Sequence, residues 1–303
     1  MRSSGLTAAL LVLAARLAAQ SDCSSVAPVY RRSCDQAVDA YKTLQPLAGI
    51  AISGGGPELG TAHTLGGLGH VFVSARVNAV KATVPNPDTT QAAISGTLPA
   101  PIIEGGIGLA RGLGSGLLAV DALAAATLLP TNLDKFSVDP SAARVGSMAL
   151  GVGYGFRVGI LNGGFPIPSV SLSWMHRTLP RVRFGNNVTG SDNYEVDTDL
   201  AATNVRLAAS MRLLLFDVAA GVGVDHYTST ADIYSDGLTH VTVPLANTRQ
   251  VLFLDAGLDL ATAKLVAELG YQTGKDQQLT TNYSEFDPKA GHVFGGIGLR
   301  FGF

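Results

Sequence analysis

The chain has no long apolar segment beyond its first twenty or so residues. Past that point no stretch of about 18 consecutive apolar residues occurs, which excludes a later membrane-spanning helix. A dominant charge is lacking too, because 21 Lys and Arg stand against 23 Asp and Glu, and charged residues make up only 15% of the chain. This balance excludes nucleic acid as a partner. Glycine is plentiful at 36 residues and is scattered through the apolar regions, which favours strands with tight turns over a helical bundle.

Cysteine is limited to Cys23 and Cys34, which lie close together near the start of the chain. No set of Cys and His residues has the spacing of a zinc site, so we expect no metal and no cofactor. In an oxidising compartment, a pair of cysteines that closes a short loop could form a disulfide. Two unpaired thiols are the alternative.

Catalytic motifs are also lacking. The stretch ISGGGPELGTAHTLGG, residues 52–67, is similar to the glycine-rich oxyanion loop of patatin-like lipases. The chain, however, contains no Gly-x-Ser-x-Gly nucleophile elbow to accompany that loop. A dinucleotide-binding loop that starts with Gly54 and Gly56 would need a third glycine at the position of Leu59. We assign no catalytic residue, expect no enzymatic activity, and interpret this stretch as a glycine-rich turn.

Residues 1–19 have the pattern of a secretory signal peptide. Arg2 precedes an apolar run from about Leu6 to Leu13, small residues follow, and cleavage fits after Ala19. The apolar run is too short to span a membrane. A buried N-terminal helix is the alternative interpretation.

Beyond residue 68, apolar residues alternate with polar or small ones. Val170, Leu172 and Trp174 lie on one face of such a segment, for example, and Ser171 and Ser173 lie on the other. A period of two residues predicts strands. The pattern predicts ten strands, at residues 68–84, 100–112, 115–130, 144–160, 168–181, 197–213, 214–231, 246–261, 262–275 and 288–303.

A β-sandwich would show the same alternation, but two features favour a barrel in lipid. The predicted strands are long, as a lipid-crossing strand of about 9–11 residues must be, whereas soluble strands peak at about 5–6 residues. The connections alternate between short links near 112–116, 161–168, 212–216 and 260–263 and long polar ones at 85–99, 131–143, 182–196, 232–245 and 276–287. Short turns on one side and long loops on the other are typical of outer-membrane barrels.

Aromatic residues give a weaker indication of two membrane interfaces. Trp174 and Tyr271 fall near the predicted outer ends of strands, and the predicted periplasmic ends carry Phe156, Phe216, Phe301 and Phe303. Aromatic residues total only 7%, so the two belts would be thin.

The chain ends GHVFGGIGLRFGF, with Ile297, Leu299, Phe301 and Phe303 on one face of the last predicted strand. This run resembles the C-terminal signal of bacterial outer-membrane β-barrel proteins, which alternates apolar residues and ends on Phe. With the strand pattern, the resemblance implies an all-β fold, a closed antiparallel transmembrane barrel of about ten strands (about 8–12). It also implies location in the outer membrane of a bacterial cell, contact with lipid, and recognition of the terminal run by the barrel-assembly machinery.

Residues 20–67 precede the predicted barrel domain, 68–303, and do not alternate. Val38, Tyr41 and Leu44 have helical spacing, which predicts a short helix near 34–45 followed by a loop. This segment could lie in the periplasm or fold into the barrel as a plug. Its apolar residues need burial, which favours the plug.

If the apolar faces meet lipid, the opposite faces line the barrel interior. By this parity the candidate lumen-lining residues are Arg76, Asn78, Glu104, Asp121, Arg206, Arg212, Asp217, Asp225, Asp255, Asp259, Lys264, Glu268 and Arg300. Because both signs of charge are present, these residues could form an internal ion-pair network or line a polar path for a solute.

Three functions are compatible with such a barrel. The first is a narrow channel or transport barrel for a small or hydrophobic solute, gated by residues 24–67. The second is a structural or surface-binding barrel that transports nothing, and the third is a barrel hydrolase. The sequence does not set the oligomeric state.

Overall fold

The computed structural model describes residues 22–86, 93–114, 116–131, 136–238, 240–260, 262–283 and 286–302. Within these ranges the chain forms one long helix, ten long strands and two short strands. The predicted signal peptide, residues 1–19, and the terminal Phe303 lie outside the described residues.

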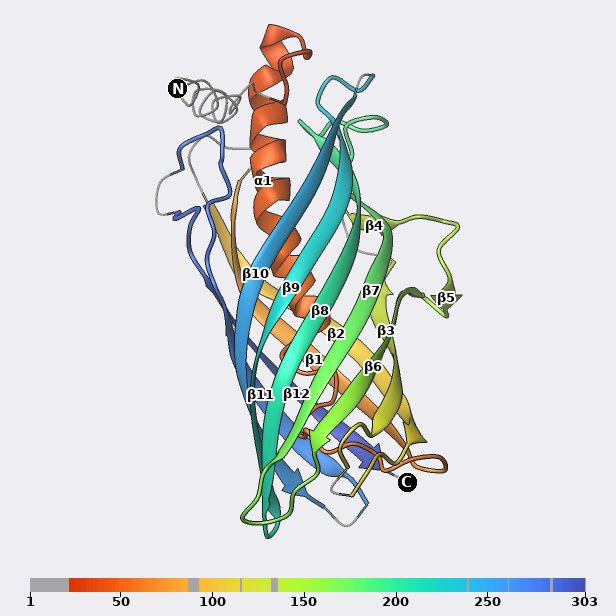
Figure 1. Ribbon diagram of the computed structural model, residues 1–303. Helices are drawn as coiled ribbons and strands as arrows, with labels where there is room; N and C mark the ends of the chain where they lie inside the picture. The colour runs from red at the N-terminus through yellow and green to blue at the C-terminus, as the bar shows by residue number, and fades with distance from the viewer. Residues whose placement is uncertain are drawn as a thin grey trace, which may run out of the picture.

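The ten long strands form one closed antiparallel barrel (Figure 1). They are β1 (Val71–Pro85), β2 (Ala93–Ala110), β3 (Val120–Pro130), β6 (Met148–Leu161), β7 (Ser169–Gly185), β8 (Glu195–Leu213), β9 (Phe216–Tyr234), β10 (His240–Asp259), β11 (Lys264–Gln272) and β12 (His292–Gly302). Each pairs with the next long strand along the chain, and β12 pairs back with β1, with Phe72 opposite Gly302 and Val80 opposite Phe294. Closure removes the exposed sheet edges, which lipid could not satisfy with hydrogen bonds.

All ten predicted strands overlap a long strand of the structure, but several strands extend beyond their predicted ends. At the end with the long connections, β2 begins at Ala93 rather than 100, β7 continues to Gly185 rather than 181, and β10 begins at His240 rather than 246. The loops predicted at 85–99, 182–196 and 232–245 are correspondingly shorter. The two short strands, β4 (Phe136–Val138) and β5 (Arg144–Val145), lie in the connection between β3 and β6.

The extended strand ends escaped prediction because polar cross-strand contacts replace apolar alternation there. Arg181 on β7 donates to the Asp197 carboxylate on β8 at 2.8 Å and also forms an ion pair with Asp232 on β9. Such pairs need no apolar outer face. The alternation therefore ends where the strands leave the apolar layer, although the strands themselves continue.

The outer surface of the barrel is apolar along the part of each strand nearest the short turns. On β9, Val218, Val222 and Val224 are exposed on the outer side, whereas Asp217 and Asp225 are buried on the inner side. A charged Lys or Arg on a lipid-facing side would cost about 2–4 kcal/mol at the middle of a bilayer. The barrel thus presents hydrocarbon outward and keeps its charges inside.

The prediction that Phe156 and Trp174 mark opposite membrane interfaces is wrong. The two residues face each other across the β6–β7 pair, with stacked rings whose centroids are 5.7 Å apart. Tyr154 also contacts Trp174, at 5.9 Å between centroids. The prediction counted residues from each turn and ignored the stagger between tilted neighbouring strands.

The helix α1 (Pro28–Ser53) lies inside the barrel and is longer than the predicted 34–45. It begins with Pro28 at its first position, where a missing N–H costs nothing. It also continues through Pro46, which cannot donate to the carbonyl of Lys42. Gln277, with its amide nitrogen turned toward that carbonyl, donates to it at 3.1 Å. This tertiary contact, which the sequence pattern does not reveal, helps the helix to pass its proline.

The start of α1 is held by a disulfide between Cys23 and Cys34. Cys23, Val26 and Cys34 pack with Val38 and Tyr41 on the helix into a buried cluster with the outer ends of β8, β9 and β10. In Figure 1, α1 enters the barrel at the end opposite the label C. No helix in the described ranges is long and apolar enough to span a membrane.

Candidate functional site

The interior of the barrel, where α1 ends and the glycine-rich segment 54–67 begins, gathers most of the predicted polar residues. The helix is held to the wall by direct side-chain contacts. The Tyr41 hydroxyl hydrogen-bonds with that of Ser229 on β9 at 2.6 Å, and Gln45 donates to the Ser229 hydroxyl at 2.7 Å. Further along, Asn78 on β1 donates to the Ala51 carbonyl at 2.9 Å.

Two wall arginines donate to the main chain where the helix gives way to segment 54–67. Arg76 donates to the carbonyls of Ser53 at 3.1 Å and Gly56 at 3.0 Å. Arg206 donates to the carbonyl of Gly54 at 3.1 Å and to that of Gly55. The Ser53 carbonyl is one that the end of a helix leaves without an intrahelical partner, and the other three carbonyls belong to the segment that follows the helix.

Two wall carboxylates accept from the same segment. Glu268 accepts the N–H of Gly55 at 2.9 Å and of Gly56 at 3.3 Å, and Asp255 accepts the N–H of Gly60 at 3.1 Å. These four wall charges thus bind the backbone of the segment. We call Arg76, Arg206, Asp255 and Glu268 the backbone clamp.

Glycine is required where the clamp approaches the backbone most closely. Gly54 has a φ of +62°, and a Cβ on it would lie 2.8 Å from Nδ2 of Asn78. A Cβ on Gly55 would lie 2.5 Å from Cγ of Phe253 and 2.7 Å from Oε2 of Glu268. The glycine run that resembled a catalytic loop in the sequence is therefore a close-packed passage through the lumen.

Buried ion pairs connect the clamp to the rest of the wall. Arg76 and Arg177 both bind the Glu104 carboxylate, at 3.0 and 2.8 Å, and Arg206 binds Asp225 at 2.6 Å. Removing one partner of such a pair is expected to cost about 3–5 kcal/mol, because an uncompensated charge is left in the interior. The network therefore fixes the position of the segment between the strands.

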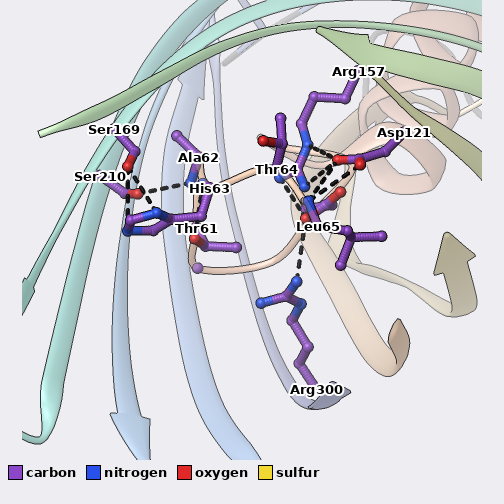
Figure 2. A network of polar contacts seen from close by, with 12 residues as sticks. Thr61, Ala62, His63, Thr64, Leu65, Asp121, Arg157, Ser169, Ser210 and Arg300 are labelled. Atoms are coloured by element: carbon purple, nitrogen blue, oxygen red, sulfur yellow. Dashed lines mark hydrogen bonds and ion pairs between the residues drawn. The ribbon is translucent and has the colours of Figure 1, made fainter. Parts of the chain in front are cut away.

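At the inner end, Asp121 and Arg157 hold the last part of the segment (Figure 2). Arg157 binds Asp121 at 2.6 Å and Glu58 of the segment at 2.5 Å, and the Leu65 N–H donates to Asp121 at 3.1 Å. Arg300 also reaches Glu58, at 3.3 Å. These contacts hold segment 54–67 at two places, Glu58 and Leu65.

His63 and Ser169 form a Ser–His pair, but one without access for a substrate. Figure 2 shows the ring of His63 directed at Ser169, and Nδ1 lies 2.8 Å from the hydroxyl oxygen. Ser169 is fully buried, and its hydroxyl oxygen also accepts the N–H of Gly163 at 2.9 Å. A nucleophile with no exposed surface cannot meet a substrate. The pair is better explained as one more tether of the segment.

At the outer end, Asp39 of α1 connects the helix to the β11–β12 connection, residues 273–291. Its carboxylate accepts the N–H groups of Thr280 at 2.9 Å and Thr281 at 2.8 Å. Burial raises the pKa of Asp39, and these two hydrogen bonds oppose that rise. Tyr283 donates to the same carboxylate at 3.4 Å. The connection is thus latched to the helix.

A small cavity lies between segment 54–67 and the barrel wall. The cavity between Glu58, Thr61, Arg157, Phe253 and Asp255 amounts to about 10 Å³. A single water molecule needs about 10–15 Å³ of such volume. This cavity therefore has room for about one water molecule.

No protein-family model and no curated protein sequence matches this chain. Among solved structures, it is similar to the translocator domain of the autotransporter NalP from Neisseria meningitidis, at 13% identity over 88% of this chain and 97% of that chain, with a TM-score of 0.46. It is also similar to the outer membrane protease OmpT from Escherichia coli, at 12% identity over 77% of this chain and 95% of that chain, with a TM-score of 0.41. It is similar as well to the attachment invasion locus protein Ail of Yersinia pestis, at 10% identity over 78% of this chain and 99% of that chain, with a TM-score of 0.34.

The class of the protein follows from its own architecture. Ten antiparallel strands close on themselves, hydrocarbon covers the outside, and paired charges fill the inside. The fold is that of an outer-membrane β-barrel protein. In such barrels the short turns face the periplasm and the long loops face outward.

In this barrel most of the predicted lumen residues are buried inside. These are Arg76, Asn78, Glu104, Asp121, Arg206, Asp217, Asp225, Asp255, Lys264 and Glu268. Arg212 and Asp259 have the same inward parity but lie at the inner rim, where their side chains are 58% and 28% exposed. There they surround the buried ion pair of Lys264 with Asp217.

Sequence reasoning missed other residues of the network, some of which parity could have found. Every second residue of a strand faces inward. Arg157 is the next inward position after the inward glycines of β6, and Arg177 continues the series of inward positions that begins with the serines of β7. Tyr227 on β9 donates to Asp225 at 2.6 Å and accepts from Gln272 on β11 at 2.8 Å. Glu58 gave no signal, because its role depends on where a loop crosses the barrel.

Proposed function

We propose that this protein is a gated outer-membrane barrel whose described state is closed, and which opens a narrow path for a small solute when segment 54–67 moves. The observation that carries this proposal is the backbone clamp. Arg76, Arg206, Asp255 and Glu268 hold the segment through hydrogen bonds to its main chain. When the segment leaves, water can replace polar contacts of this kind, whereas water could not replace the contacts of an apolar core.

The charged wall behind the segment favours a polar solute over a hydrophobic one. Displacement of the segment would leave charges of both signs on β1, β8, β10 and β11 facing the lumen. A ten-stranded barrel is narrow, so the path would exclude large solutes. A lumen lined by rings of charged side chains selects by size and charge.

The test is ion conductance of the full chain in planar lipid bilayers. Wild-type protein is expected to conduct rarely, because the clamp keeps the segment in place. The double variant Arg206→Gln, Glu268→Gln removes one cation and one anion from the clamp and is expected to open at least about tenfold more often. The control is Arg183→Gln, which changes an arginine that is 51% exposed at the outer end of β7.

A double variant that folds, as shown by its heat-dependent migration in detergent gels, and yet conducts no more than wild type would contradict the gated barrel. Conductance that rises equally in the Arg183→Gln control would also contradict it. In both cases the clamp is not what closes the lumen.

A surface-binding barrel is the second candidate, favoured by the length of β7 to β10. On β8 the outward Val205 and Leu207 are apolar, but Asp199 and Asp197 follow on the same side. The strands therefore carry a polar outer wall well beyond the apolar layer. Conductance absent from both wild type and the clamp variant would favour this candidate.

The partners implied by the terminal sequence are also part of this proposal. Ile297 and Leu299 on β12 are 57% and 40% exposed on the outer side, as residues facing lipid would be. We propose that the terminal run is the segment recognised by the barrel-assembly machinery. Ile297→Asp with Leu299→Asp is expected to reduce the amount of folded protein in the outer membrane at least about tenfold, because each charge would face lipid.

A further inference from the structure

The wall of the barrel has a defect between β8 and β9, on the long-loop side of the apolar layer. In the series of paired residues between these two strands, Thr198–Ala231 is followed directly by Ala201–Thr228, so two pairs are missing. Asp199 is one of the residues that the ladder skips. It lies six positions from Val205 on the same outward side, about 20 Å along the strand.

The side chain of Asp199 takes the place of the missing ladder partner. Its carboxylate accepts the backbone N–H of Thr230 on β9 at 2.8 Å. On the next strand, Thr230 is paired with Pro244, which has no N–H to donate. The defect is therefore rich in acceptors and poor in donors.

An open hollow of about 490 Å³ lies over this defect. This volume is within the range of about 300–1,000 Å³ that small-molecule sites occupy. Asp199 and the hydroxyls of Thr228 and Thr230 supply polar atoms, and the outward Ala201, Pro244 and Ala246 supply apolar surface. The hollow thus combines a carboxylate with a short apolar wall.

The charge of Asp199 has no cation paired with it among the residues that the structure describes. The nearby Arg181 is bound to Asp197 and Asp232 instead. A group that carries only donors and one positive charge would complement this set of acceptors. A primary ammonium group has three donors and no acceptor.

We propose that this hollow binds a primary alkylammonium ion from the outer side of the membrane. The ammonium group binds Asp199 and the hydroxyls of Thr228 and Thr230, and the alkyl chain lies along Pro244 and Ala246. This site is on the outer wall, apart from the lumen, so it does not depend on whether the barrel conducts.

The test is a titration of the full chain, in nanodiscs of zwitterionic lipid, with cadaverine followed by saturation-transfer NMR. Pentanediol of the same chain length is the neutral comparison and is expected to bind at least about tenfold more weakly, because a charged hydrogen bond is lost. Asp199→Asn keeps an oxygen for the Thr230 N–H but removes the charge, and it is expected to weaken cadaverine binding at least about tenfold.

Two further variants keep the test decisive. Ala246→Trp fills the hollow without touching the carboxylate and is expected to abolish binding. Asp276→Asn removes an equal charge from an exposed position on the β11–β12 connection and is expected to leave binding unchanged. Cadaverine binding that survives both Asp199→Asn and Ala246→Trp would overturn the proposal. Equal binding of pentanediol, or an equal loss in Asp276→Asn, would overturn it as well.

Discussion

The carboxylate of Asp39 on α1 accepts the backbone N–H of Thr280 at 2.9 Å, although the two residues are 241 positions apart in the chain. Thr281 donates to the same carboxylate, so a single side chain joins the plugging helix to the β11–β12 connection. No sequence period signals this contact, because one partner lies on a helix and the other in an irregular connection.

Replacing Asp39 with Ala is expected to release the β11–β12 connection without unfolding the barrel. Two N–H groups would lose their acceptor, at a cost of about 1–3 kcal/mol. Hydrogen exchange of Thr280 and Thr281 should therefore become at least about tenfold faster. Asp236→Asn, a charge change in the β9–β10 connection, is the control and should leave this exchange rate as it is.

Replacing Gly55 with Ala is expected to disturb the seating of segment 54–67. The added Cβ would lie 2.5 Å from Cγ of Phe253. Overpacking of this kind typically costs about 1–3 kcal/mol. Urea unfolding in lipid vesicles should show the loss, whereas Gly96→Ala, where an added Cβ meets nothing within 4 Å, should show none. Equal midpoints for the two variants would mean that the passage is looser than described.

Reduction of the Cys23–Cys34 disulfide is expected to free the start of α1 and leave the barrel intact. The bond closes a loop with a sequence separation of 11, for which chain entropy predicts about 3 kcal/mol. Arg31 and Arg32 lie within this loop and are exposed, so trypsin should cut there at least about tenfold faster after reduction. Cutting after Lys275, outside the loop, should be unaffected.

Replacing Arg157 with Gln is expected to destabilise the protein far more than replacing Arg183 with Gln. Arg157 binds both Asp121 and Glu58, and its side chain is 2% exposed. Its loss should cost about 3–5 kcal/mol. Arg183 is 51% exposed, and exposed pairs contribute about 0–1 kcal/mol. Unfolding in lipid vesicles measures both, and similar losses would show that Arg157 is not buried as described.

The alternation of side chains was enough to predict the ten strands and the side on which most charges lie. It works because lipid permits only apolar side chains on the outside of a strand, as on β9, where Val222 and Asp217 face opposite ways. It failed where the strands rise above the apolar layer. There, contacts such as Arg181 with Asp197 support the ladder instead.

The candidate site was less accessible to sequence reasoning. Arg76, Glu268 and Asp255 were identified as inward residues, but not as partners of the glycine-rich main chain. Those partners depend on how segment 54–67 crosses the barrel, and a loop has no period to report its path. The helix predicted near 34–45 also proved longer, because it continues through Pro46 to Ser53.

The most direct test of this account is the depth of outward residues on β9, measured by spin labels in lipid vesicles. The two native cysteines are bonded to each other, so single labels at Val218, Val222, Thr228 and Thr230 are specific. We predict that Val218 and Val222 are reached by oxygen and shielded from a water-soluble nickel reagent, and that Thr228 and Thr230 show the reverse. Four positions equally open to the nickel reagent would show that no bilayer surrounds the barrel, and would contradict the account.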